Sequence, residues 1–153
     1  MTAPQQRLLL VVDDLEAARD ELIGRGAEAG VEAVITCGTD LASSEAAVAL
    51  ADAHPAVWAA VGVHPHEARQ ACGDAAEGED GPVSIDEALI DRIRRLAGGP
   101  RVVAIGEIGL DYHYDFSPRA AQRAVLARQL ALAAELRMPV ILKMTGIRSS
   151  AAR

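Results

Sequence analysis

The sequence predicts an α/β fold in which parallel strands alternate with helices. Five short apolar segments recur along the 153 residues, and each of the first four is followed by a stretch with helical periodicity. The segments are almost continuously apolar, as expected for a parallel sheet that is covered by helices. Half of the residues are apolar, which is enough for one domain with a substantial core, so we assign residues 1–153 to a single domain.

The strands are recognised as apolar runs that end at turn-forming or charged residues. They are expected at residues 8–12, 31–36, 57–63, 102–105 and 140–142. Because each run is short and lies between helical stretches, we expect helices to connect neighbouring parallel strands.

Two helices are expected in the first half of the chain. Asp13 or Asp14 caps the first, whose apolar face includes Leu22. Asp40 opens the second, and Pro55 ends it because the residue before a proline avoids helical geometry.

Two further helices are expected in the second half, after a surface loop over residues 69–83 that is rich in small and acidic residues. The first of these begins at Ser84, the start of a capping-box pattern, and ends at Gly98. The second begins at Pro118 and carries Leu130 on its apolar stripe.

Composition limits the classes of protein to which the chain could belong. Two cysteines are too few to predict a disulfide framework or a zinc knuckle. The net charge of −7 argues against broad adhesion to nucleic acid, although bound cations can neutralise an acidic cleft locally. We find no apolar run long enough for a membrane span and no signal-peptide core, so we expect a cytoplasmic protein that does not contact membranes.

Polar side chains follow two of the predicted strands. His64 and His66 come after the third strand, and Glu107 and Asp111 come after the fourth, among glycines. Because the carboxyl ends of parallel strands meet at one edge of a sheet, we expect these side chains to share a cleft. A carboxylate suits a hard divalent cation, and imidazoles suit zinc, manganese or iron.

Each of these residues also has a structural interpretation, which the sequence leaves open. Glu107 could form an ion pair in a loop, and His64 could hydrogen-bond the backbone of a His-Pro turn. His66 could be solvated, Asp111 could cap the turn, and Tyr112 could pack against the following helix.

The strongest motif is Gly-Glu-Ile-Gly-Leu-Asp-Tyr at residues 106–112. Together with residues 29–40 and 60–66 and further matches as far as Ile141, it resembles the TatD-type metal-dependent deoxyribonuclease family of the amidohydrolase-like TIM barrels. The resemblance covers residues 15–142 and implies (β/α) units of a TIM barrel, of which this chain holds about five of the eight strands.

The resemblance also implies a function, namely hydrolysis of DNA or of a small phosphodiester by metal-activated water. It implies that His64 and Glu107 are catalytic residues and that Glu107 is also the ligand of a divalent metal ion such as Mg²⁺, Mn²⁺ or Zn²⁺. The neighbouring positions that would line the cleft are His66, Asp111, Tyr112 and Lys143.

The sequence departs from the family in two places. The first strand lacks the family's His-x-His ligands, and Lys143 stands where the family has a histidine after the fifth strand. A lysine cation there would repel a metal ion. We therefore expect a truncated or frameshifted member with a divergent tail at residues 143–153, poor metal occupancy and impaired activity.

Two alternatives remain. The chain could be a non-catalytic half-barrel that binds a partner, with self-association through an open sheet edge. It could instead be a different enzyme in which Lys143 forms a Schiff base.

Overall fold

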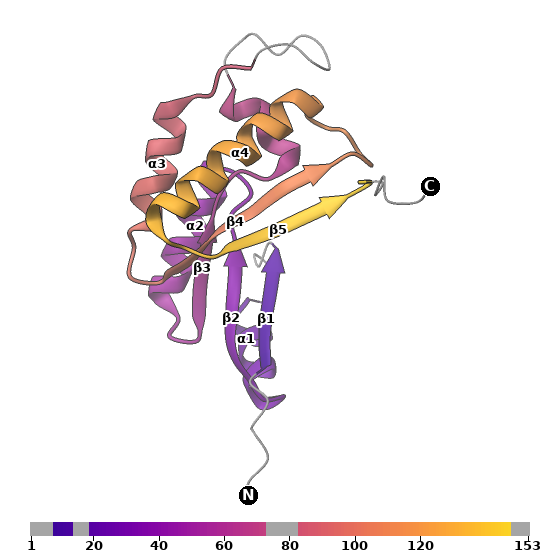
Figure 1. The fold of residues 1–153 in the computed structure, drawn as a ribbon. Helices are drawn as coiled ribbons and strands as arrows, with labels where there is room; N and C mark the ends of the chain where they lie inside the picture. The colour runs from indigo at the N-terminus through magenta and orange to yellow at the C-terminus, as the bar shows by residue number, and fades with distance from the viewer. Residues whose placement is uncertain (1–7, 14–18, 73–82, 148–153) are drawn as a thin grey trace, which may run out of the picture.

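The sheet contains five parallel strands that lie side by side in chain order, β1-β2-β3-β4-β5 (Figure 1). The structure is a computed structural model that describes residues 8–13, 19–72 and 83–147. The strands are β1 (Leu8–Asp13), β2 (Val31–Cys37), β3 (Val57–Val61), β4 (Val102–Asp111) and β5 (Val140–Thr145). The helices are α1 (Arg19–Glu28), α2 (Leu41–Ala53), the 3-10 helix η1 (Pro65–Ala71), α3 (Glu87–Ala97) and α4 (Arg119–Leu136).

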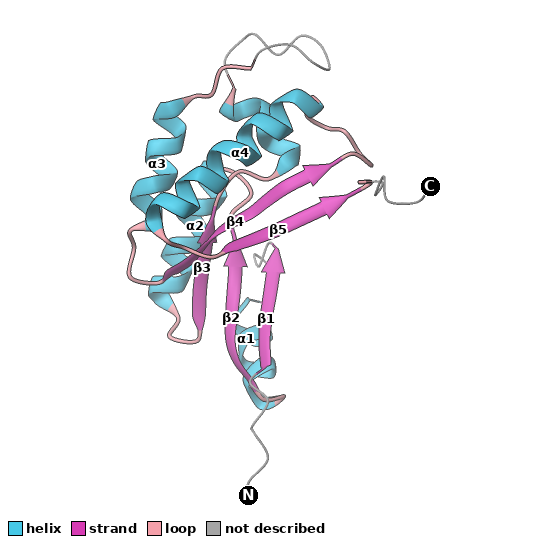
Figure 2. Ribbon diagram, viewed as in Figure 1, coloured by secondary structure: helices cyan, strands magenta, loops and turns pink. Residues whose placement is uncertain are grey.

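The sheet curls strongly, so that β4 and β5 cross β1 and β2 at a steep angle (Figure 1). Helices α2, α3 and α4 gather beside β3 and β4, while α1 contacts β2 (Figure 2). Because each parallel strand needs a long crossover to reach its neighbour, the helices and strands alternate along the chain. The predicted α/β fold with a parallel half-barrel is confirmed.

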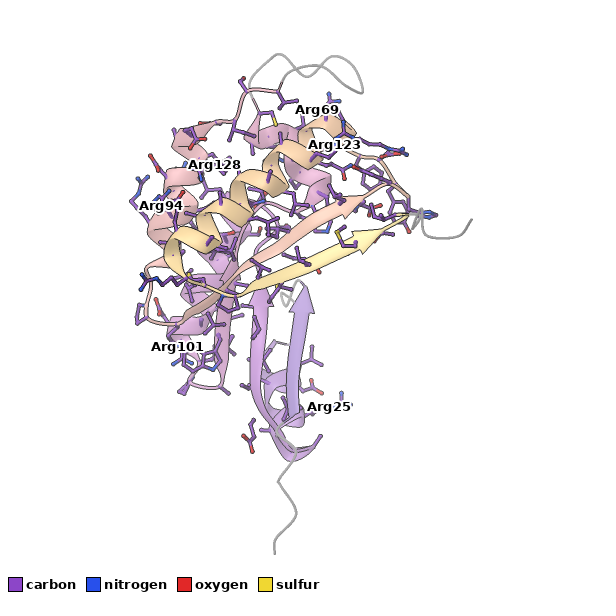
Figure 3. All side chains as sticks on the ribbon, viewed as in Figure 1. Arg25, Arg69, Arg94, Arg101, Arg123 and Arg128 are labelled. Carbon is purple, nitrogen blue, oxygen red and sulfur yellow. The ribbon has the colours of Figure 1, made fainter. Side chains whose placement is uncertain are left out.

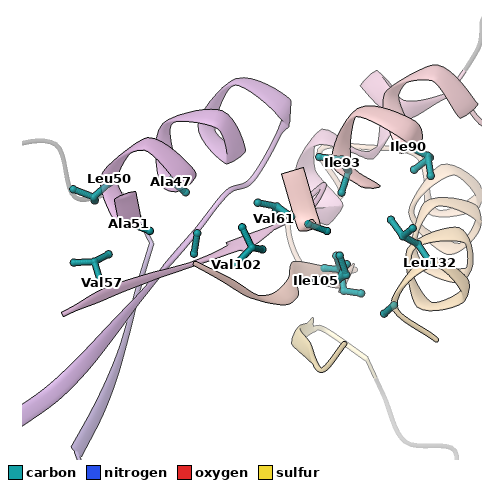
Figure 4. Packing of buried hydrophobic residues seen from close by; sticks show 14 of the residues in the cluster. Ala47, Leu50, Ala51, Val57, Val61, Ile90, Ile93, Val102, Ile105 and Leu132 are labelled. Atoms are coloured by element: carbon teal, nitrogen blue, oxygen red, sulfur yellow. The ribbon is translucent and has the colours of Figure 1, made fainter. Parts of the chain in front are cut away.

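The main hydrophobic core lies between strands β3 and β4 and helices α2, α3 and α4 (Figure 4). Ile93 of α3, Ile105 of β4 and Leu132 of α4 are fully buried there. On α2 most of the inward side chains are small, as at Ala47 and Ala51, and this lets the helix lie close to the sheet. Burying each large aliphatic side chain stabilises the fold by about 1.5–3 kcal/mol, so this core holds the half-barrel together.

The starts of α2 and α3 show which capping predictions were right. Asp40 accepts a hydrogen bond from the Ser43 N–H at 2.7 Å, and the Ser43 hydroxyl accepts one from the Asp40 N–H at 2.9 Å. At α3 the cap is Asp86, whose Oδ1 accepts from the Leu89 N–H at 3.2 Å. The capping box expected at Ser84 is therefore wrong, because a carboxylate nearer to the helix fills that role.

Two residues predicted to face the core are exposed. Leu22 of α1 and Leu130 of α4 keep 48% and 40% of their surface in solvent. The buried stripe of α4 instead contains Gln122 and Gln129 beside Leu132. The prediction for α4 assumed an apolar inner face, whereas polar side chains hydrogen-bond the backbone of neighbouring segments there.

The loop expected at residues 69–83 is smaller than predicted. Residues 69–71 belong to η1, and Cys72 forms an isolated antiparallel bridge with Ile85. The remainder of that prediction, over residues 73–82, lies outside the described residues.

Charged side chains cover the outer surface of the helices (Figure 3). Arg94 of α3 pairs with Glu135 of α4 at 2.7 Å, and Arg128 of α4 pairs with Glu87 of α3 at 2.8 Å. None of the helices in the described ranges is long and apolar enough to cross a membrane.

Candidate active site

Two histidine–carboxylate pairs lie side by side at the carboxyl edge of the sheet. His64 Nε2 is 3.5 Å from Glu107 Oε2, and His66 Nε2 is 2.7 Å from Asp111 Oδ2. The two imidazole rings meet edge to face, with centroids 4.4 Å apart. The structure therefore brings together the four side chains that the sequence placed at this edge.

Glu107 lies inside β4, not in the turn that the sequence predicted. The strand continues past Ile105 to Asp111, because β5 pairs with it as far as the partners Asp111 and Thr145. The N–H of Glu107 also donates to the carbonyl of Gly38, at the end of β2, at 3.3 Å. The carboxylate therefore projects from within a strand, at an irregularity in the β4–β5 pairing between Ile105 and Ile108.

The glycines around Glu107 allow β5 to approach closely. A Cβ at Gly106 would lie 2.7 Å from the Ile141 Cβ, and one at Gly109 would lie 1.8 Å from the carbonyl oxygen of Lys143. No side chain fits in that space. Glycines in such a cluster are typical of a turn, but here they allow two strands to pack together.

Lys143 lies within β5, since the strand extends from Val140 to Thr145. Its Nζ is 3.7 Å from Glu107 Oε2, and its side chain is partly exposed. The strand predicted at residues 140–142 is therefore too short, because residues 143–145 continue it. Glu107 consequently has a histidine nitrogen and a lysine nitrogen near the same carboxylate oxygen.

His64 presents a protonated nitrogen towards Glu107. Its Nδ1 accepts a hydrogen bond from the His66 N–H at 3.2 Å, so the neutral ring carries its proton on Nε2. Burial, with smaller contributions from His66 and Lys143, lowers the pKa of His64 to about 4. The ring is therefore neutral at pH 7, and its buried Nε2 makes no hydrogen bond within the described structure. This geometry suits a hydrogen-bond donor to a bound ligand.

Asp111 is surrounded by hydrogen-bond donors. Besides His66, its carboxylate accepts from the N–H groups of His113 at 2.9 Å and Tyr114 at 3.1 Å. Burial alone would raise the pKa of Asp111, but the bonds from Tyr114, His66 and His113 outweigh it and lower the pKa to about 2. Asp111 therefore holds the turn after β4 and orients His66.

Tyr112 lies beside α4. The Arg119 guanidinium lies 4.6 Å from the centre of its ring, and the Arg119 side chain also pairs with Asp115. This contact links the turn after β4 to the first turn of α4.

The residues present here do not by themselves fit a divalent metal ion. Within residues 8–13, 19–72 and 83–147, no three His, Cys, Asp or Glu side chains come close enough to hold one. Lys143 places a positive charge beside Glu107, and the protonated Nε2 of His64 offers no lone pair to a metal. Of Glu107, His64 and Lys143, only Glu107 could serve as a metal ligand.

Three residues that support the site were not singled out as site residues from the sequence. The Gln129 amide accepts from the Val63 N–H at 2.7 Å and donates to the Val63 carbonyl at 3.0 Å, which fixes the segment before His64. The Ser44 hydroxyl bonds the Gly62 N–H at 3.2 Å. Gln122 binds the backbone of Asp111 in the same way as Gln129 binds Val63. The pattern that could have revealed the glutamines is two amides seven residues apart on one face of α4.

Comparison with known proteins identifies the ancestry of this site. The sequence matches the TatD-related DNase family over residues 10–147. The chain belongs to the TatD-related DNase family. It is 42% identical over 123 residues to the 3'-5' ssDNA/RNA exonuclease TatD of Enterobacter lignolyticus, and 38% identical over 134 residues to that of Pectobacterium parmentieri. These alignments cover 80% and 87% of this chain.

The fold agrees with this assignment to the TatD family. The crystal structure of YjjV, a TatD homologue from Escherichia coli K12, superposes with a TM-score of 0.72 at 25% identity and covers 92% of this chain. The chain spans 42% and 46% of the length of the two TatD exonucleases, and 51% of the YjjV chain. The observed half-barrel thus corresponds to about half of these relatives.

Proposed function

We propose that this TatD-family chain acts on phosphodiester bonds of single-stranded nucleic acid at the carboxyl edge of its sheet. The observation that carries the proposal is the group formed by Glu107, His64 and Lys143, with contacts of 3.5 and 3.7 Å to one carboxylate oxygen. Family membership and the names of the exonuclease relatives support this choice of substrate.

Each side chain of the group has a chemical part in such a hydrolysis. Water must lose a proton as its oxygen bonds to phosphorus, and the Glu107 carboxylate is placed to accept that proton. The Nε2–H of His64 and the ammonium of Lys143 are donors for the phosphate oxygens, where negative charge develops. The bond from phosphorus to the leaving oxygen then breaks, and that oxygen takes up the proton that Glu107 accepted, which returns the carboxylate to its charged form.

We further propose that the chain performs this chemistry poorly. The family resemblance implies a divalent ion, whereas Glu107 alone among the grouped residues could be its ligand and Lys143 opposes it. We therefore assign no step to a metal ion. Slow turnover that depends on Glu107 is the expected behaviour.

The test is hydrolysis of bis(p-nitrophenyl) phosphate and of labelled single-stranded DNA by the 153-residue protein, with Mg²⁺, with Mn²⁺ and with EDTA. Glu107→Gln keeps the shape of the side chain and removes its charge. Glu45→Gln is the matched control, because Glu45 is an exposed glutamate that pairs with Arg92 at 2.9 Å on the helical surface. We expect slow hydrolysis that Glu107→Gln reduces about tenfold or more and that Glu45→Gln leaves unchanged.

Two other outcomes would contradict parts of the proposal. Rapid Mn²⁺-dependent cleavage lost in Glu107→Gln would contradict the proposed impairment and support catalysis. Folded protein with no turnover above that of Glu107→Gln would contradict catalysis by this chain.

A second candidate is a non-catalytic interaction module. It is favoured by the exposed apolar side chains along β5, where Leu142 and Met144 keep 52% and 51% of their surface in solvent. In the described sheet β5 pairs with β4 alone, so a second copy of the chain could add to its free edge. Sedimentation equilibrium of wild type and Leu142→Lys tests this, since loss of a dimer in the variant is expected only if β5 forms the interface.

A further inference from the structure

Two aromatic rings stack on each other in the turn between β4 and α4 and face solvent. Tyr114 and Phe116 lie nearly parallel, at 16°, with centroids 5.6 Å apart. They keep 58% and 65% of their surface exposed. A stacked pair uses one face of each ring, so this exposure leaves apolar ring surface open on the molecule. The proposed hydrolysis gives no role to either residue.

The exposed pair is continuous with the candidate active site. The His66 ring meets Phe116 at 4.8 Å and Tyr114 at 5.9 Å between centroids, edge to face in both cases. On its other side His66 meets His64 at 4.4 Å, and His64 lies 3.5 Å from Glu107. A series of rings therefore leads from the reactive carboxylate to the surface.

The turn that carries the pair is held at both ends. At its start, Asp111 accepts hydrogen bonds from the N–H groups of His113 and Tyr114. At its end, the buried Ser117 hydroxyl donates to the His66 carbonyl at 2.6 Å and accepts from the Arg69 N–H at 3.1 Å. These bonds fix the rings before any ligand arrives, so binding does not have to order them.

We propose that Tyr114 and Phe116 form a stacking site for a base of single-stranded nucleic acid next to the bond to be cleaved. The inference rests on the proposed function and names how the substrate is held. Aromatic side chains bind bases through their ring faces, and such faces are available in single strands but not within a duplex. With a net charge of −7, the chain offers little general attraction to phosphate, so stacking has to provide much of the affinity.

The charges near the pair agree with a base as the ligand. Asp115, between the two rings in sequence, is paired with Arg119, so neither brings a lone charge to the rings. Lys143 lies on the Glu107 side and is positioned for a phosphate. The aromatic pair and the charged group thus offer separate contacts for a base and for a phosphate.

The test measures binding apart from catalysis, in EDTA, by fluorescence anisotropy of a short labelled oligothymidine. The matched probe is an abasic oligonucleotide of equal length, which keeps the phosphates and removes the bases. We expect the wild-type protein to prefer the base-containing probe. Phe116→Ala should weaken that binding roughly fivefold or more and leave binding of the abasic probe unchanged.

Three further variants separate ring stacking from general hydrophobic contact. Phe116→Trp should restore binding and show quenched fluorescence with the oligothymidine, whereas Phe116→Leu should not restore binding. Leu130→Ala is the control, because Leu130 is an exposed apolar residue of α4.

Equal binding of both probes by wild type, unaltered binding by Phe116→Ala, or no binding at all would each overturn the proposal. In any of those cases, Glu107-dependent hydrolysis of bis(p-nitrophenyl) phosphate, which has no base, would leave the proposed function intact.

Discussion

The two pairs at the sheet edge each combine a histidine with a carboxylate, but their carboxylates lie in different environments. Asp111 receives hydrogen bonds at 2.7, 2.9 and 3.1 Å and is 1% exposed. Glu107 instead has a histidine nitrogen at 3.5 Å and a lysine nitrogen at 3.7 Å, both beyond good hydrogen-bond length. Asp111 accepts hydrogen bonds from backbone N–H groups and thereby holds the turn after β4. The Glu107 Oε2 atom, which makes no hydrogen bond within the described residues, retains the capacity to bind a ligand.

The largest expected effect is a loss of stability when Asp111 is replaced. Asp111→Ala leaves the donors of His66, His113 and Tyr114 without their acceptor in a buried place. We expect the free energy of unfolding to fall by about 2–4 kcal/mol, measured by urea denaturation. Asp86→Ala is the control, since loss of an exposed helix cap should cost about 1 kcal/mol. Equal losses in the two variants would show that Asp111 contributes no more to stability than an exposed helix cap.

The two pairs should also respond to acid in different pH ranges. His64 has a pKa of about 4 in the folded chain against 6.5 for the ordinary side chain, so the unfolded chain binds its proton first. Its contribution to stability is therefore lost as pH falls from about 6.5 to 4. Asp111, with a pKa lowered to about 2, loses its contribution below about pH 4.

Urea midpoints measured across this pH range would check the assignment. His64→Gln should flatten the upper part of the profile, and Asp111→Asn the lower part. A profile that both variants change in the same range would contradict it.

A smaller effect is expected on metal binding at Glu107. Lys143→Gln removes the ammonium that lies 3.7 Å from Glu107, and should therefore strengthen binding of Mn²⁺. Because Lys143 is partly exposed, we expect a gain of about fivefold, or about 1 kcal/mol after screening, by titration calorimetry. Lys143→Arg keeps the charge and serves as the control. If both variants bind Mn²⁺ as wild type does, repulsion by Lys143 is not what limits the site.

The smallest effect is expected for the stability of Glu107→Gln. Its contacts with His64 and Lys143 are 3.5 and 3.7 Å long and the substitution keeps the shape of the side chain, so the unfolding free energy should change by less than about 1 kcal/mol. The same urea titration used for Asp111→Ala measures it. A loss as large as that of Asp111→Ala would show that Glu107 is mainly structural.

The sequence predicted the strands, helices and the edge at which His64, His66, Glu107 and Asp111 meet, because apolar periodicity and parallel topology determine these. It did not predict that β4 continues through Glu107. Glycine is typical of turns, and only the tertiary contact with β5 shows that the glycines here pack strands.

The sequence also did not predict that the two pairs have different roles. Asp111 accepts its hydrogen bonds largely from backbone N–H groups. Because every residue except proline has such a group, the sequence does not show which carboxylate will be bonded in this way. For the same reason, the buried amides of Gln122 and Gln129 were visible in the sequence as polar interruptions, but the groups they bind were not.

The close approach of β4 to β5 beside Lys143 depends on a residue that has no side chain. At Gly109, a single methyl group would occupy the place of the Lys143 carbonyl oxygen. Alanine scanning treats such a change as among its mildest, yet here it would force β4 and β5 apart beneath the reactive carboxylate. In a functional survey of this chain, the least conspicuous substitution near the site would therefore disturb it more than the removal of a charge.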